Sequence, residues 1–152
     1  MKNKNLIFKI SAIVLCALTI VPLFLNYITL RSNNNKFPRL FADTAGSGDT
    51  LLVISRVLFI TTIVVAFVLM VGLILQFFFK NNILNWVVVG TSVFIMITAT
   101  LSFVSTLLYC LSISEFGKYV WYPSIGGYVL LFCALAAPIL GYLGNRTPAK
   151  KK

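Results

Sequence analysis

Long apolar runs separated by short polar segments dominate the chain. Residues 57–79 carry no charge at all, and three other segments are almost as apolar. A helix crosses roughly 30 Å of hydrocarbon with about 20 apolar residues, and its backbone polar groups are satisfied within the segment. The pattern therefore predicts an all-α, integral membrane four-helix bundle that forms a single transmembrane domain. Its helices are expected at approximately residues 6–30, 51–79, 83–112 and 124–144.

The polar segments between these helices predict their arrangement. Residues 31–50 form a 20-residue first outer loop, residues 80–82 a tight inner turn, and residues near 112–125 a shorter second outer loop. Because the inner turn is so short, the second and third helices are predicted to be antiparallel neighbours.

Basic residues are divided unequally between the two ends of the predicted bundle. The end that holds both termini carries eight Lys and Arg residues, whereas the end with the two loops carries five, together with all three acidic residues. Because cations near helix ends tend to stay in the cytoplasm, both termini are predicted inside, in a multi-pass protein of the cell membrane. Residues 145–152 then form a basic cytoplasmic tail. The eight cations are Lys2, Lys4, Lys9, Lys80, Arg146, Lys150, Lys151 and Lys152.

The first apolar run has a second interpretation. Lys2, Lys4 and Lys9 precede it, as cations precede the core of a secretory signal peptide. The run is longer than a usual signal core, and residues 30–32 offer no small-x-small cleavage pattern. The first helix is therefore predicted to be retained, with cleavage as the alternative.

Composition excludes a water-soluble protein. Hydrophobic residues make up 59% of the chain and charged residues 11%, against roughly 25% charged residues in globular proteins. A formal charge of +10 would indicate nucleic acid binding in a soluble protein, but these cations lie at the ends of apolar runs, where they face lipid headgroups. The expected partners are the lipid bilayer and another membrane protein or a second copy, and no nucleic acid.

Arg56 is the one ionisable residue predicted inside the bilayer. If the second helix begins near Thr50, the Arg56 alpha carbon lies roughly 9 Å below the outer boundary, a depth from which the side chain can reach the headgroups. The alternative is an intramembrane ion pair with Asp49 or with Glu115, because charges within membranes are commonly paired.

Small residues recur every four positions in the fourth helix, at Cys133, Ala137 and Gly141. Helices in lipid associate through close contacts at small residues. This stripe is a helix-packing face, either inside the chain's own bundle or between two copies.

Hydroxyl side chains follow one side of the third helix. They either line a wet path or bond to helix carbonyls and neighbouring helices. The second helix offers a compatible surface at Ser55, Thr62, Ala66 and Gln76, and we predict that Gln76 bonds to Asn85 across the inner turn. The stripe consists of Thr91, Thr98, Ser102 and Ser105.

The loops and prolines carry further predictions. Asp49 or Thr50 is expected to cap the second helix, and Pro22 and Pro138 to kink the first and fourth helices. Aromatic residues at 119–122 are typical of the belt at the lipid boundary. In the first loop three apolar residues either rest among the headgroups or anchor a partner: Phe37, Leu40 and Phe41.

The sequence has few residues of the types that serve in catalysis. There is no histidine and only one glutamate, and the three cysteines fall in apolar segments without metal-ligand spacing. No catalytic, cofactor or metal residues are predicted. The leading hypothesis is a non-enzymatic membrane protein that acts through protein contacts, as an accessory subunit, assembly factor, adhesion-type protein or protective partner. The alternative is a subunit of a small oligomeric channel or transporter, with the hydroxyl stripe lining its path.

The layout of a first outer loop, a tight inner turn and a shorter second outer loop is similar to that of claudin-like tetraspan proteins. The first loop departs from that pattern, because it has no tryptophan and no cysteine pair. The resemblance therefore covers layout alone and assigns no family.

Overall fold

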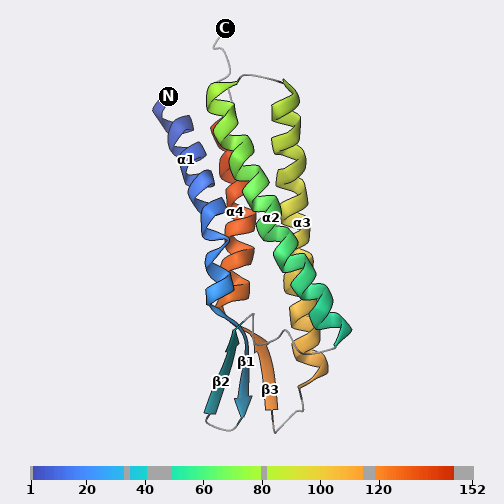
Figure 1. Ribbon diagram of the computed structural model, residues 1–152. Helices are drawn as coiled ribbons and strands as arrows, with labels where there is room; N and C mark the ends of the chain where they lie inside the picture. The colour runs from blue at the N-terminus through green and yellow to red at the C-terminus, as the bar shows by residue number, and fades with distance from the viewer. Residues whose placement is uncertain (1, 33–34, 41–48, 80–81, 115–118, 146–152) are drawn as a thin grey trace.

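Four long helices stand side by side with a small sheet at one end of the bundle (Figure 1). The computed structural model describes residues 2–32, 35–40, 49–79, 82–114 and 119–145. Helix α1 begins, and helix α4 ends, at the end opposite the sheet (Figure 1). The elements in chain order are α1 (Lys2–Leu18), the 3-10 helix η1 (Val21–Phe24), β1 (Asn26–Ser32), β2 (Asn35–Leu40), α2 (Thr50–Phe78), α3 (Asn82–Ser112), β3 (Tyr119–Pro123) and α4 (Ile125–Asn145).

The helices are long and apolar enough to cross a membrane, and the chain is a multi-pass membrane protein. The spans expected at 51–79, 83–112 and 124–144 coincide with α2, α3 and α4 to within one residue. Large apolar side chains are exposed on the outer faces of the helices, where lipid replaces water. Examples are Val64, Phe67, Phe94, Ile97 and Phe132.

The expectation of an all-α fold was incomplete. Parts of both predicted outer loops form a three-stranded sheet, and the span expected at 6–30 covers most of α1, all of η1 and most of β1. Pro22 explains where α1 ends. It has no N–H to donate to the carbonyl of Leu18, and its ring would clash with that carbonyl in a continued helix, so the α-helix stops at Leu18. Pro22 therefore lies in η1 and does not kink a helix, whereas Pro138 lies inside α4.

The sheet joins chain segments that are far apart in the sequence. Strand β1 lies in the centre and pairs antiparallel with β2 on one side and β3 on the other. Leu30 stands opposite Phe37 of β2 and Trp121 of β3, and a bulge interrupts the β1–β2 register between Asn26 and Ile28. The sheet therefore unites the predicted first and second outer loops in one folded unit.

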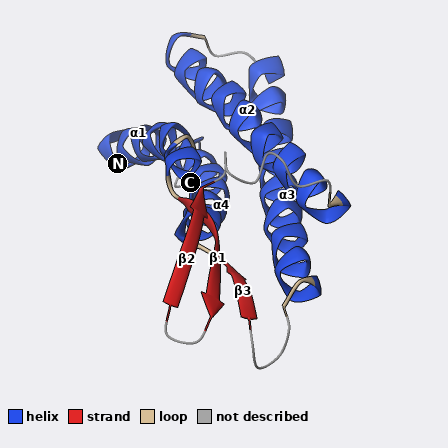
Figure 2. Ribbon diagram, turned by 60° about the horizontal axis from the view of Figure 1, so that its bottom comes forward, coloured by secondary structure: helices blue, strands red, loops and turns tan. Residues whose placement is uncertain are grey.

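The helices pack as two closely associated pairs, α1 with α4 and α2 with α3 (Figure 2). Glycines mark the tightest approaches. A Cβ at Gly72 of α2 would lie 3.0 Å from the Val88 side chain of α3, and one at Gly144 of α4 would lie 3.1 Å from the backbone of α1. Close backbone approach at small residues is the main source of helix association in lipid.

Gly126 provides a test of this packing, because a Cβ there would lie 2.8 Å from the Asn26 carbonyl and 3.3 Å from that of Pro22. Gly126→Ala is expected to destabilise the fold by about 1–3 kcal/mol through overpacking. Gly127→Ala is the matched control, because its Cβ would meet only the Phe103 ring at 3.7 Å. Thermal unfolding in detergent should show a lower melting temperature for Gly126→Ala alone. Equal melting temperatures would contradict the close approach of α4 to β1.

Candidate functional site

A cluster of buried hydroxyl groups lies where the sheet meets the helices. It consists of Tyr27 from β1, Ser55 from α2, and Ser102 and Thr106 from α3. The Tyr27 hydroxyl bonds to Ser55 Oγ and, at 2.7 Å, to Thr106 Oγ1. Ser55 Oγ and Thr106 Oγ1 are 2.5 Å apart. One tyrosine thus connects the central strand to two helices.

The same cluster joins α2 to α3 by a reciprocal pair of hydrogen bonds. Ser55 Oγ donates to the Ser102 carbonyl at 3.1 Å, and Ser102 Oγ donates to the Ser55 carbonyl at 3.0 Å. Thr106 Oγ1 also lies within hydrogen-bond distance of the Ser102 carbonyl, at 2.8 Å, and because each hydroxyl has a single proton, Tyr27, Ser55 and Thr106 share three protons among these contacts. Because all four hydroxyls have partners, the cluster adds specificity without leaving a polar group unpaired.

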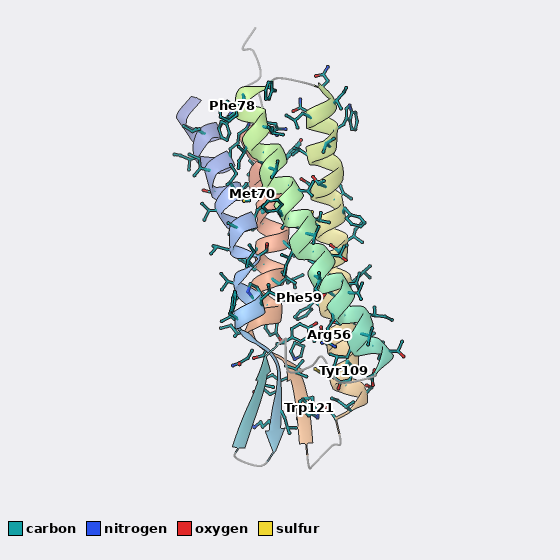
Figure 3. All side chains as sticks on the ribbon, viewed as in Figure 1. Arg56, Phe59, Met70, Phe78, Tyr109 and Trp121 are labelled. Carbon is teal, nitrogen blue, oxygen red and sulfur yellow. The ribbon has the colours of Figure 1, made fainter. Side chains whose placement is uncertain are left out.

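The Tyr27 ring is fixed as firmly as its hydroxyl. It meets the Phe59 ring edge-on with centroids 5.3 Å apart, and Leu52 and Cys110 belong to the same apolar cluster. Figure 3 shows Phe59 on α2 in the half of the bundle nearer the sheet. Burial raises the pKa of the Tyr27 phenol, so this group stays protonated and acts as a structural anchor.

Two further contacts attach the sheet. Ser114, beyond the end of α3, accepts a hydrogen bond from the Trp121 amide at 2.9 Å and donates one to the Cys110 carbonyl at 2.6 Å. The Ser124 amide, before α4, donates to the Tyr27 carbonyl at 2.9 Å. The sheet is therefore attached to α2, α3 and α4.

A second site lies in the other half of the molecule, between α3 and α4. It is a groove of about 510 Å³ whose walls are mainly apolar. Its polar groups include Asn85 in the first turn of α3 and Asn145 at the end of α4. The lining residues are Asn85, Val88, Val89, Ser92, Val93, Met96, Pro138, Ile139, Tyr142 and Asn145.

The Gln76–Asn85 hydrogen bond predicted across the inner turn is confirmed. Gln76 Nε2 donates to Asn85 Oδ1 at 3.0 Å. Gln76 Oε1 is buried and has no hydrogen-bond partner within the described parts of the chain. Gln76, Ser55, Thr62 and Ala66 are all buried, as a surface of α2 that faces its neighbours requires.

The hydroxyl stripe of α3 is used in helix packing over much of its length. Thr91 and Thr98 donate to carbonyls of their own helix, at 2.8 and 3.0 Å, and Thr98 and Ser102 are buried. Ser102 bonds to α2. Ser105 is half-buried.

The small residues of α4 face the chain's own helices. Cys133, Ala137 and Gly141 are buried, and a Cβ at Gly141 would lie 3.3 Å from the Leu73 side chain of α2 and 3.9 Å from Ala12 of α1. This stripe therefore packs inside one bundle.

The remaining predicted site residues belong to the start of α2 and to the two segments predicted as outer loops. Asp49 caps α2, because its Oδ1 accepts from the Leu51 amide at 3.0 Å. Arg56 is half-buried near the sheet end of α2 (Figure 3). Glu115 lies outside the described residues, so an ion pair of Arg56 stays a prediction. The backbone of Phe37 and Leu40 lies in β2, whereas Phe41 is outside the described residues.

The role of Tyr27 was not predicted from the sequence. Two features of the sequence favour a strand hairpin after Pro22. Ile28 and Thr29 are β-branched, and the two asparagines at 33 and 34 favour a tight hairpin turn. Within the described residues there is no group of three His, Cys, Asp or Glu side chains that could hold a metal ion.

Comparison with known proteins finds no matching family model, no similar curated protein and no similar solved structure.

The anchoring role of Tyr27 predicts the effect of removing its hydroxyl. Tyr27→Phe should lower stability by about 1–2 kcal/mol, because the hydrogen bonds to Ser55 and Thr106 are lost. Tyr128→Phe is the control, since Tyr128 is exposed. Thermal unfolding in detergent should separate the two variants.

The pH dependence of the same variant has a definite sign. Burial raises the folded-state pKa of Tyr27 above the ordinary tyrosine value of 10.0. The Tyr27 hydroxyl therefore contributes fully to the free energy of unfolding below that value, and this contribution is lost as the pH rises through the folded-state pKa. The difference in free energy of unfolding between wild type and Tyr27→Phe should therefore decrease in alkaline buffer. A difference that is absent at neutral pH would refute the anchor.

Proposed function

We propose that this protein is a non-enzymatic component of the cell membrane that acts through contact with another membrane protein, with its sheet as the outer contact surface. The observation that carries the proposal is the attachment of the sheet through Tyr27 to α2 and α3. This attachment gives two polar loop segments one ordered shape. A preordered surface loses less conformational entropy when a partner binds.

The orientation rests on charge. The sheet lies at the end opposite the start of α1 and the end of α4 (Figure 1). In the sequence, eight of the 13 basic residues lie near the chain termini or in the turn between α2 and α3, and the three acidic residues lie in the segments between β2 and α2 and between α3 and β3. The positive-inside tendency therefore supports cytoplasmic termini and an external sheet.

The buried polar groups support a structural role over transport. Ser55, Ser102 and Thr106 bond to one another or to helix carbonyls, and Thr98 bonds within α3. The bonds between Ser55 and Ser102 hold α2 and α3 together, whereas the Thr98 hydroxyl is satisfied within its own helix and needs no water. The channel alternative requires the stripe of α3 to turn toward water in an oligomer.

The edge strands β2 and β3 contain residues that oppose non-specific pairing with strands of other chains. Strand β2 contains Lys36, Pro38 and Arg39, and β3 ends at Pro123. Charged residues and prolines on edge strands oppose strand addition from another chain. A partner is therefore expected to recognise the outward side chains of the sheet, among them Arg31 and Val120, which are exposed.

Site-specific photocrosslinking in intact cells tests the contact. A photoreactive residue at Val120 should give one discrete adduct heavier than the 16.9 kDa chain. The same residue at Phe67, exposed on the lipid-facing side of α2, is the matched control and should give none. Lack of adducts from both Val120 and Arg31 would refute the contact role. Ion conductance by the purified, reconstituted protein would favour the channel alternative.

A further inference from the structure

The groove between α3 and α4 opens sideways from the bundle. Val89, Val93, Ile139 and Tyr142 line it and are also exposed on the molecular surface. In the membrane this surface faces hydrocarbon. A lipid chain can therefore enter the groove directly from the bilayer without crossing water.

Packing on the other side of α4 explains why the groove exists. Gly141 and Gly144 bring α4 close to Leu73 of α2 and to the backbone of α1. A different face of α4, with Ile139 and Tyr142, lines the groove opposite α3.

The length of the groove indicates the kind of occupant. On α3 it extends from Asn85 to Met96, which is roughly 16 Å at about 1.5 Å per residue. The hydrocarbon core is roughly 30 Å thick, so the groove spans one leaflet. An acyl chain of a single phospholipid fits it.

The polar groups place the lipid headgroup at the end where α3 begins. Asn85 and Asn145 lie there, and Asn85 Oδ1 already accepts from Gln76, which leaves the Asn85 amide N–H groups as the donors at the groove. Ser92, farther along, is satisfied by the Val88 carbonyl at 2.6 Å. The remainder of the groove is mainly apolar.

Charge selects the headgroup. Arg146 directly follows Asn145 in the sequence, and residues 146–152 include four basic residues and no acidic one. Lys2, Lys4 and Lys9 lie in the half of α1 at this end of the bundle. A basic surface on the cytoplasmic side attracts anionic headgroups. We infer that the groove binds one anionic phospholipid of the cytoplasmic leaflet, with an acyl chain between α3 and α4 and its phosphate near Asn85 and Asn145.

This inference shares with the proposed function only the membrane setting and the orientation. The two can fail separately, because lipid retention is measured on the groove and partner adducts are measured on the sheet.

Native mass spectrometry of the purified full chain tests the inference. The probes are phosphatidylglycerol and phosphatidylcholine with identical palmitoyl and oleoyl chains. The wild type is expected to retain phosphatidylglycerol at least about tenfold better than phosphatidylcholine. Val93→Trp and Ile139→Trp fill the groove from its two walls and should each reduce this retention about tenfold. Val64→Trp, on the exposed face of α2, is the matched control and should leave it unchanged.

A charge variant separates the headgroup from the chain. Replacing Arg146, Lys150, Lys151 and Lys152 with Gln should lower phosphatidylglycerol retention to the level of phosphatidylcholine. Equal retention of both lipids by the wild type, or unchanged retention in both Trp variants, would overturn the inference. Lipid-free dimers of the wild type that Val93→Trp dissociates would also overturn it, because a second copy would then occupy the groove.

A second measurement covers the case in which the Trp variants melt below the Val64→Trp control. Phosphatidylglycerol with a photoreactive acyl chain is bound to the wild type and the labelled peptides are identified. Adducts confined to residues 85–96 and 138–145 support the groove. Adducts spread equally over the exposed face of α2 refute it.

Discussion

Hydrogen bonding of the backbone in hydrocarbon is the constraint on which this structure depends. Every amide and carbonyl in the lipid must find a partner within the protein, and four long helices meet that requirement. The constraint also decides where other structure can form. The sheet lies at one end of the bundle, beside the last turns of α3, and unpaired strand edges there can be hydrated.

The transition from helix to sheet is controlled by a few residues. Pro22 ends α1 at Leu18, and the chain then passes through one 3-10 turn into β1. The side chain of Tyr27 in β1 bonds to Ser55 of α2 and Thr106 of α3. Hydrogen bonds between membrane helices contribute about 0.6–2 kcal/mol each. Several bonds in one cluster are therefore comparable to a substantial part of the stability of an ordinary domain.

The helices could be predicted from the sequence because their length is set by the bilayer. The Gln76–Asn85 bond was also predictable, since the tight turn between α2 and α3 determines which positions face each other. The sheet was not predicted. Tyr27, Ile28 and Leu30 continue the apolar run of α1, so hydropathy alone extends the helix through them. The pairing of β1 with β3 joins residues that are more than 80 positions apart, which no local pattern reveals. The groove was missed for the same reason, because it depends on how far α4 stands from α3.

The two ends of the molecule have different chemistry. Buried hydroxyl groups order the sheet end, whereas the other end has a mainly apolar groove between α3 and α4. Thiol labelling in intact cells tests this layout most directly, because Cys16, Cys110 and Cys133 are all buried. The account predicts that a cysteine at Val120 reacts with a membrane-impermeant maleimide, and that a cysteine added after Lys152 reacts only once the membrane is permeabilised. Labelling of the C-terminal cysteine in intact cells, with protection of the one at position 120, would contradict it.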